Sequence, residues 1–244
     1  MLKKFEQLPF DMQNESVKKY YDILAKKKAS LLFKRLFDIA VSLFLLLLLS
    51  PVMLVLALII KIDSKGPVFF RQVRVTTYGK QFRIFKFRTM VANAEKIGTL
   101  VTTKNDNRVT KVGAAIRKTR IDEIPQLFNI LFGDMTLVGT RPEVVKYVQH
   151  YTDEMKATLL LPAGVTSEAS ICYKDEDKLL ENSADADRTY IDEILPEKMK
   201  YNLSAIENFS FFSDIKTMFR TVFAVLKNDG DDDKEDNGKN GREE

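Results

Sequence analysis

The sequence is poor in the residues that build disulfides and histidine-rich metal centres. Its 244 residues include one cysteine, Cys172, one histidine, His150, and no tryptophan. A lone cysteine excludes an intramolecular disulfide framework and is typical of a reducing compartment. A lone histidine excludes a histidine-rich metal cluster. The length leaves room for one domain plus a membrane element, but not for two full domains.

The net charge of +4 conceals an uneven distribution along the chain. Residues 228–244 hold eight acidic and three basic residues and no apolar one, which predicts a disordered acidic tail. The remaining chain carries 35 basic and 26 acidic residues. Beside a membrane segment, such an excess favours anionic lipid or phosphate-bearing substrates. We expect no nucleic-acid partner, because no recognised nucleic-acid-binding motif is present.

One apolar run stands out, the 21 residues from Ala40 to Ile60, in which only Ser42 and Ser50 are polar. As a straight helix it would measure roughly 31 Å, just enough to span the hydrocarbon of a bilayer. It begins too far from the N-terminus for a cleavable signal peptide, and no small-x-small cleavage site follows it. The run therefore predicts a helix in the membrane.

Two topologies are open for this helix, a straight span and a re-entrant hairpin. Pro51 lies in the middle of the run, and a proline there removes a backbone donor and predicts a sharp kink. Ser50 could satisfy one of the freed backbone groups. Positive charge flanks both ends, at Lys34–Arg35 and at Lys61 and Lys65, whereas a span normally shows an imbalance. These features favour the hairpin, with both ends on the cytoplasmic side.

The rest of the chain reads as an α+β domain that is mostly helical and contains a small β-hairpin. Residues 67–75 and 81–90 form the predicted hairpin, and the apolar parity switches after Ile84, which predicts a bulge. Helices are expected over residues 91–96, from Val112, over 122–132 with Gly133 as the stop, and over 143–161. Residues 209–227 form an amphipathic helix that belongs either to the core or to the membrane interface.

The acidic pair Asp122-Glu123 has a structural and a catalytic interpretation. Structurally, Thr119-x-x-Asp122 matches a helix capping box, and Pro125 suits a first helical turn. Catalytically, the nearby cations Arg117, Lys118, Arg120 and Arg141 would hold a carboxylate ionised and bind phosphate oxygens. An ionised aspartate can attack phosphorus and form an acyl-phosphate. Such an approach of two anions requires a bridging Mg²⁺.

Several stretches occur in the order that one family uses. They read LFKRLFDIAVSLFLLLLLSPVMLVLALIIKIDSKGPVFFRQVRV, then FRIFKFRTM, then RKTRIDEIPQLFNILFGDMTLVGTRPE. Together they cover roughly residues 32–165, and the chain resembles the bacterial sugar transferases, which are monotopic phosphoglycosyl transferases. The resemblance implies transfer of a sugar-1-phosphate from a UDP-sugar to polyprenyl (undecaprenyl) phosphate, with UMP as the second product. It also implies a ping-pong reaction through a phospho-aspartyl enzyme at the cytoplasmic face of the bacterial inner membrane.

Carried over to this sequence, the resemblance assigns roles to individual residues. It implies that Asp122 is the nucleophile and a Mg²⁺ ligand, and that Glu123 is its dyad partner, acting on the incoming polyprenyl phosphate. Arg117 would bind that phosphate. Three further cations would contact phosphates of the nucleotide sugar or of the transferred group: Lys86, Arg88 and Arg141.

The resemblance also bears on the membrane helix. Ser50-Pro51 would form the bend that returns the helix to the cytoplasmic side. Asp38 would pair with a local cation at the helix entry. The implied organisation is N-terminal surface helices over residues 1–30, the re-entrant hairpin over 31–62, a catalytic domain over 63–227 and the acidic tail over 228–244.

The sequence departs from the family pattern most strongly at PAGVTSEAS, where a Pro-Gly-x-Thr-Gly-Trp-Ala segment is usual. Ser167-Glu168 in that segment leaves the identity of the sugar open, and Thr140 stands where proline is common. Two rivals to the enzyme remain: a non-catalytic membrane scaffold of a glycan-assembly complex, and a single-pass anchor that carries an unrelated domain. A homo-oligomer and glycan-assembly partners are also left open.

Overall fold

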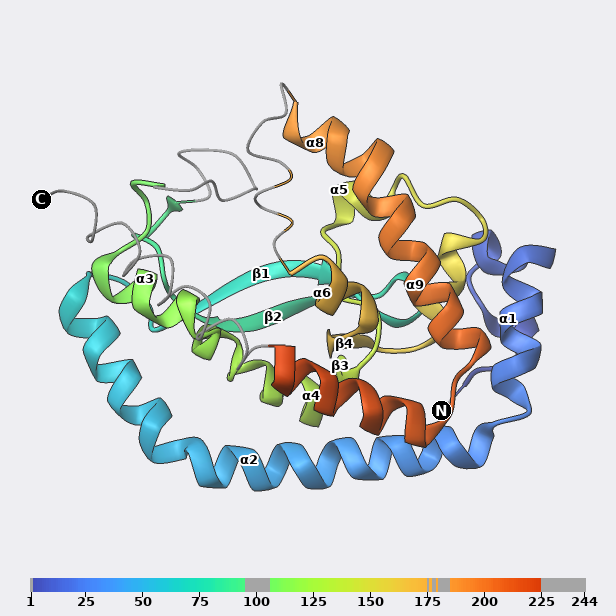
Figure 1. Cartoon of the computed structure of the whole chain (residues 1–244), viewed down its shortest axis with the longest axis horizontal. Helices are drawn as coiled ribbons and strands as arrows, with labels where there is room; N and C mark the ends of the chain where they lie inside the picture. The colour runs from blue at the N-terminus through green and yellow to red at the C-terminus, as the bar shows by residue number, and fades with distance from the viewer. Residues whose placement is uncertain (1, 95–105, 175, 177–178, 180–184, 225–244) are drawn as a thin grey trace, which may run out of the picture.

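The computed structural model describes residues 2–94, 106–174, 176, 179 and 185–224 (Figure 1). Its α-helices are α1 (Glu15–Ala25), α2 (Lys28–Asp63), α3 (Lys111–Lys118), α4 (Gln126–Phe132), α5 (Val145–Val148), α6 (Glu168–Cys172), α8 (Ala186–Thr189), α9 (Leu195–Glu207) and a last helix over residues 211–224. The strands are β1 (Phe69–Val75), β2 (Gln81–Phe87), β3 (Met135–Val138) and β4 (Ala163–Thr166). The prediction of a mostly helical α+β fold with little sheet is confirmed.

The predicted hairpin is present, but the predicted bulge is wrong. Strands β1 and β2 pair in antiparallel register without interruption from Phe69 opposite Phe87 to Val75 opposite Gln81. The buried positions change from even-numbered to odd-numbered residues along β2 because other elements pack on both faces of this two-stranded ribbon. Side chains alternate between faces along a strand, so Ile84 packs towards α4 on one face and Phe87 packs towards α2 and α3 on the other.

The free edge of β2 is covered by a side chain of α4. Asn129 accepts a hydrogen bond from the Phe85 backbone N–H at 2.8 Å and donates one to the Arg83 carbonyl at 3.0 Å. Its amide thereby replaces a neighbouring strand and satisfies backbone groups that would otherwise be buried without partners. The predicted stop of α4 at Gly133 is confirmed, since this residue has a φ of 86° and closes the helix.

A second sheet was not expected from the sequence. Strands β3 and β4 pair in parallel, and Gly164 of β4 lies so close to the Gly139 backbone that an added Cβ would be 2.2 Å from it. The single helix predicted over residues 143–161 is wrong. The chain forms α5 and a 3₁₀ segment over Met155–Leu160, because Tyr151 leaves the helical path to enter the core and Thr152 then caps a new turn.

The helix predicted over residues 91–96 is not supported in its described part. Residues 91–94 form a turn in which Asn93 has a positive φ of 66°, and the remainder lies outside the described residues. The expected N-terminal surface helices correspond to α1 and two short 3₁₀ turns before it. One face of this segment is buried against the 3₁₀ segment Met155–Leu160 and the end of α9. The cluster is formed by Leu8, Met12, Val17, Tyr20, Leu24, Ala157, Leu160, Ile206 and Phe209.

The start of α2 is attached to the domain by polar side chains. Lys34 donates to the Val138 carbonyl at 2.7 Å and pairs with Asp214 at 2.6 Å. Arg35 donates to the last carbonyls of α4, at Ile130 and Leu131. The expectation that Asp38 pairs with a cation is wrong.

Asp38 instead binds the edge of β3. Its carboxylate accepts hydrogen bonds from the Thr136 hydroxyl at 2.6 Å and from the Leu137 N–H at 3.2 Å. These bonds, with those of Lys34, fasten the base of α2 to the strand that leads into the loop of Arg141.

Among the described residues, α2 is the helix that is long and apolar enough to cross a membrane. It is continuous over 36 residues, contains Pro51, and changes direction along its course (Figure 1). Pro51 cannot donate to the carbonyl of Leu47, four residues earlier. The Ser50 hydroxyl donates to that carbonyl at 2.8 Å.

The helix over residues 211–224 has its polar face towards the domain. Thr217 and Arg220 bond to Glu168, and Asp214 pairs with Lys34. Its apolar side chains point outward, with Phe212 81%, Phe219 62% and Phe223 68% exposed. A core-packing helix would show the reverse pattern, so that alternative is wrong for this face. The same inside-out pattern occurs on α2, whose outward side is apolar.

Candidate active site

Asp122 and Glu123 lie in a 3₁₀ turn, Ile121–Glu123, between α3 and α4. The capping-box interpretation of this segment is wrong. Thr119 ends α3 by donating to the carbonyls of Ala115 and Ile116 and caps no following helix. Arg120 then adopts a left-handed conformation with a φ of 53°, which is uncommon outside glycine and is often found at functional sites. The acidic pair is therefore presented by a sharp turn.

Glu123 is the centre of an ion-pair cluster. Its Oε1 accepts from Lys86 of β2 and from Arg141 of the loop after β3, each at 2.8 Å. Burial alone would raise the pKa of Glu123, but Arg141 and Lys86 outweigh burial and hold that pKa well below its usual range. Glu123 itself raises the pKa of Arg141, while burial lowers that of Lys86. Glu123 is thus an ionised carboxylate held between two cations.

Asp122 has the opposite environment. It is 9% exposed, and within the described part of the chain its carboxylate has no hydrogen bond or ion pair. Burial raises its pKa, and the nearby Lys86 opposes that shift. A buried carboxylate without partners, adjacent to several cations, is suited to attack an electrophile rather than to stabilise the fold.

The remaining predicted site residues lie in two places. Arg117, in the last turn of α3, is anchored by its Nε, which donates to the Thr89 hydroxyl at 2.7 Å, and its charge acts on Asp122. Arg88 is 5% exposed and bonds at the end of α2, donating to the carbonyls of Ile60 and Ser64. The structure therefore brings Asp122 and Glu123 together with Lys86, Arg117 and Arg141, and it gives Arg88 contacts with the end of α2.

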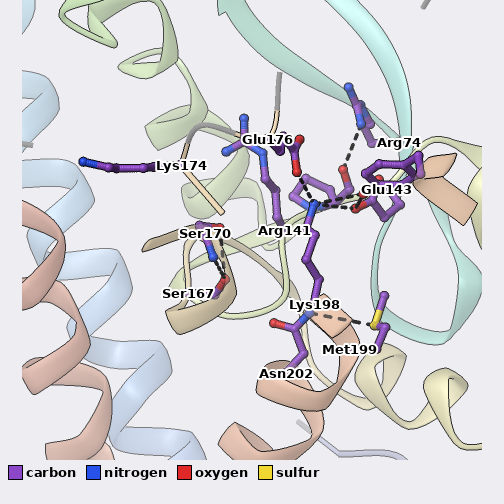
Figure 2. A network of polar contacts seen from close by, with 12 residues as sticks. Arg74, Arg141, Glu143, Ser167, Ser170, Lys174, Glu176, Lys198, Met199 and Asn202 are labelled. Carbon is purple, nitrogen blue, oxygen red and sulfur yellow. Dashed lines mark hydrogen bonds and ion pairs between the residues drawn. The ribbon is translucent and has the colours of Figure 1, made fainter. Parts of the chain in front are cut away.

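Sequence reasoning missed a second buried network beside Arg141. Lys198 of α9 pairs with Glu176 at 2.8 Å and lies 3.5 Å from Glu143, and it donates to the Tyr190 hydroxyl at 2.9 Å. Figure 2 shows the Lys198 side chain pointing towards Glu143 and Glu176, with Arg141 beside them. Glu143 lies in the TRPE motif, but no pattern in the sequence connects it to Tyr190 or Lys198.

A Mg²⁺ site must be judged from the donors present. The described residues contain no group of three or more His, Cys, Asp or Glu side chains that could hold a metal ion by themselves. Mg²⁺ commonly takes one or two carboxylates and completes its shell with water and substrate phosphates. Asp122, unpaired and next to phosphate-attracting cations, fits that mode of binding, whereas Glu123 is already engaged by Lys86 and Arg141.

The fold and the site together define a protein with one long apolar helix, a candidate membrane anchor, and a carboxylate centre surrounded by cations. The family model of the bacterial sugar transferases matches residues 29–228, and the chain belongs to that family.

Three relatives illustrate its range. The chain is 39% identical over 198 residues to the UDP-glucose:undecaprenyl-phosphate glucose-1-phosphate transferase of Klebsiella pneumoniae, covering 80% of this chain and 40% of that protein. It is 38% identical over 196 residues to the UDP-N-acetylgalactosamine-undecaprenyl-phosphate N-acetylgalactosaminephosphotransferase of Aeromonas hydrophila. That alignment covers 79% of this chain and 43% of that protein. It is 36% identical over 202 residues to the uncharacterized sugar transferase EpsL of Bacillus subtilis (strain 168), covering 82% of this chain and 90% of that protein. The chain thus spans about two fifths of the length of the first two relatives.

Proposed function

We propose that this chain is a phosphoglycosyl transferase that moves a sugar-1-phosphate from a UDP-sugar to a polyprenyl phosphate. The products are a polyprenyl diphosphate sugar and UMP. This is the first membrane step in assembling a glycan such as capsule, exopolysaccharide, O-antigen or a glycoprotein glycan. The names of the relatives from Klebsiella and Aeromonas support both substrates. The observation that carries the proposal is the contrast between Asp122, buried and unpaired, and Glu123, held by two cations.

In the first half-reaction, an Asp122 carboxylate oxygen attacks the phosphorus that bears the sugar. A bond forms between Asp122 and phosphorus, the bond to the UMP oxygen breaks, and UMP leaves with that electron pair. In the second half-reaction, an oxygen of the polyprenyl phosphate attacks the same phosphorus and releases Asp122. Glu123 orients or deprotonates the incoming phosphate, and Arg117 binds it.

The surrounding cations perform the electrostatic part of this chemistry. Lys86 and Arg141 face the acidic pair and would bind phosphate oxygens as negative charge develops there. Arg88 is proposed to assist at the phosphates, as the family resemblance implies. Mg²⁺, held by Asp122 and by substrate phosphates, would neutralise the charge between carboxylate and phosphate when bound.

The membrane helix is proposed to be a re-entrant hairpin, bent at Ser50-Pro51, on the cytoplasmic face of the inner membrane. The bond from the Ser50 hydroxyl to the Leu47 carbonyl supports a bend that is stable in lipid, because the group freed by Pro51 is satisfied. The outward apolar faces of α2 and of residues 211–224 support a monotopic placement, since both helices could insert from one side.

The test uses detergent-solubilised protein with Mg²⁺, undecaprenyl phosphate and a panel of UDP-sugars, and it measures UMP release. We expect release from one donor or a small set of donors, and none from the Asp122→Ala variant. Lack of release from every donor, with the protein folded and the lipid verified, would favour the alternative of a non-catalytic scaffold in a glycan-assembly complex. The segment PAGVTSEAS, which differs from the usual family pattern, is the sequence feature that favours this alternative.

A further inference from the structure

The loop that carries Arg141 is held at successive residues by groups outside the acidic pair. The carbonyl of Pro142 accepts from Arg74 of β1 at 3.1 Å, and the carbonyl of Glu143 accepts from the Val75 N–H at 3.0 Å. On the other side of the loop, the Thr140 carbonyl accepts from the Gly164 N–H at 2.8 Å. The backbone of residues 140–143 is therefore fixed to both small sheets.

The side chain of Glu143 is held by a different part of the chain. Its Oε1 accepts from the Tyr190 hydroxyl at 2.6 Å and lies 3.5 Å from Lys198 Nζ. All three side chains are buried, with Glu143 7%, Tyr190 4% and Lys198 4% exposed. Burial, aided by Glu143, raises the pKa of Tyr190, so its hydroxyl remains a donor at all ordinary pH values.

A buried charged cluster is a costly way to pack a domain, because apolar side chains of similar volume are often equally stabilising. Here the cluster lies next to a candidate catalytic loop. We propose that Tyr190 and Lys198 are positioning residues, which hold Glu143 and so direct the Arg141 guanidinium to Glu123 and to the donor phosphates. Arg141 contacts the substrate and these two residues act through it. This inference rests on the proposed transferase function.

The chain supplies a matched control for the test. Tyr147 and Tyr190 pack with ring centroids 4.5 Å apart, and each hydroxyl donates to a carboxylate at 2.6 Å. Tyr147 bonds to Asp187, which also pairs with Lys146, whereas Tyr190 bonds to Glu143 in the loop of Arg141. Phenylalanine at either position keeps the ring and removes one hydroxyl. At position 190 the change removes the bonds to Glu143 and Lys198, and at position 147 it removes the bond to Asp187.

The experiment measures UMP release at varied UDP-sugar concentrations for wild type, Tyr190→Phe, Tyr147→Phe and Glu143→Gln. We expect Tyr190→Phe and Glu143→Gln to raise the donor KM about three- to tenfold, the range of one hydrogen bond, with a smaller change in kcat. Tyr147→Phe should leave the donor KM at the wild-type value. Thermal unfolding of each variant verifies that it is folded, and Glu143→Gln carries the test if Tyr190→Phe does not fold.

A double-mutant cycle shows whether Tyr190 acts through Arg141. In an Arg141→Gln background, Tyr190→Phe should have no further effect on the donor KM. A Tyr190→Phe variant with the wild-type KM, or an effect that adds fully to that of Arg141→Gln, would overturn the inference. Wild-type protein that releases no UMP from any donor would instead reject the proposed function, and the inference with it.

Discussion

Asp122 and Glu123 are adjacent in the chain, yet the structure shifts their pKa values in opposite directions. Glu123 lies 2.8 Å from both Lys86 and Arg141, which hold its pKa well below the usual range. Asp122 lacks such partners among the described residues, and burial raises its pKa. One carboxylate therefore uses the local cations to stay ionised, and the other is left available for reaction. This division of roles leads to predictions of opposite sign for the two residues.

Asp122→Asn should stabilise the protein at neutral pH. The pKa of Asp122 is raised on folding above 3.8, so the folded state disfavours the ionised form. The ionised Asp122 carboxylate therefore destabilises the folded protein when the pH is above the pKa of the folded state. This effect disappears as the pH falls below the pKa of the unfolded state. Thermal unfolding should show a higher melting temperature for the variant at pH 7.5, and a shrinking difference towards acid pH. A lower melting temperature at pH 7.5 would contradict the assigned environment.

Glu123→Gln should destabilise the protein at neutral pH. It leaves Lys86 and Arg141 as half-buried cations without their carboxylate, a change that costs about 1–3 kcal/mol. Because folding lowers the pKa of Glu123, its ionised carboxylate stabilises the folded protein at pH values above 4.5. This stabilisation is lost as the pH falls through the pKa of the folded state. Denaturant unfolding measures the loss. The double variant Glu123→Gln/Arg141→Gln should recover part of it, and equal instability of the two variants would argue against the pairing.

Gly164→Ala should disturb the loop of Arg141 without touching the acidic pair. A Cβ at this position would lie 2.2 Å from the Gly139 backbone, which cannot move aside as a flexible side chain can. We expect a loss of about 1–3 kcal/mol in unfolding free energy, or more, together with a raised KM for the UDP-sugar. Gly79→Ala is a useful comparison for the KM, because nothing lies within 4 Å of its added Cβ and its φ of 75° makes the substitution destabilising through local backbone strain alone. That variant should keep the wild-type KM.

Pro51→Ala should favour a straight membrane span over the re-entrant hairpin. Alanine restores the backbone donor to the Leu47 carbonyl and removes the ring clash that bends the helix. The measurement is labelling by a membrane-impermeant thiol reagent in a Cys172→Ser background, with single cysteines placed at Lys4 and at Lys65. In the parent both sites should react from the cytoplasmic side alone. In Pro51→Ala they should react from opposite sides, and an unchanged pattern would contradict the role of Pro51.

Local patterns in the sequence predicted the parts of the fold that depend on neighbouring residues. The apolar run, the hairpin, the start of α3 near Val112 and the stop at Gly133 are all local features, and the structure contains them. The bulge after Ile84 was wrong because a change of parity can also arise from burial on both faces of a ribbon. Sequence alone does not distinguish these two causes.

The unexpected features are contacts between distant segments. Strands β3 and β4 pair across an intervening stretch that was predicted to be one helix. The bond from Tyr190 to Glu143 joins residues 47 positions apart, and neither residue type suggests the partner. Asp38 was expected to pair with a cation near it in the sequence, but it binds Thr136 of β3, 98 positions away. The catalytic roles of Asp122, Glu123 and Arg117 came from family resemblance and stay predictions.

The central claim is that Asp122 is a nucleophile that becomes covalently attached to the sugar phosphate. The most direct measurement is a rapid-quench assay of UMP release from the UDP-sugar with Mg²⁺ and without polyprenyl phosphate, for wild type and Asp122→Ala. The account predicts a burst of about one UMP per wild-type enzyme, with a matching mass increase on the peptide that contains Asp122, and no burst in the variant. UMP that appears only after the lipid acceptor is added, or a burst that survives in Asp122→Ala, would contradict it.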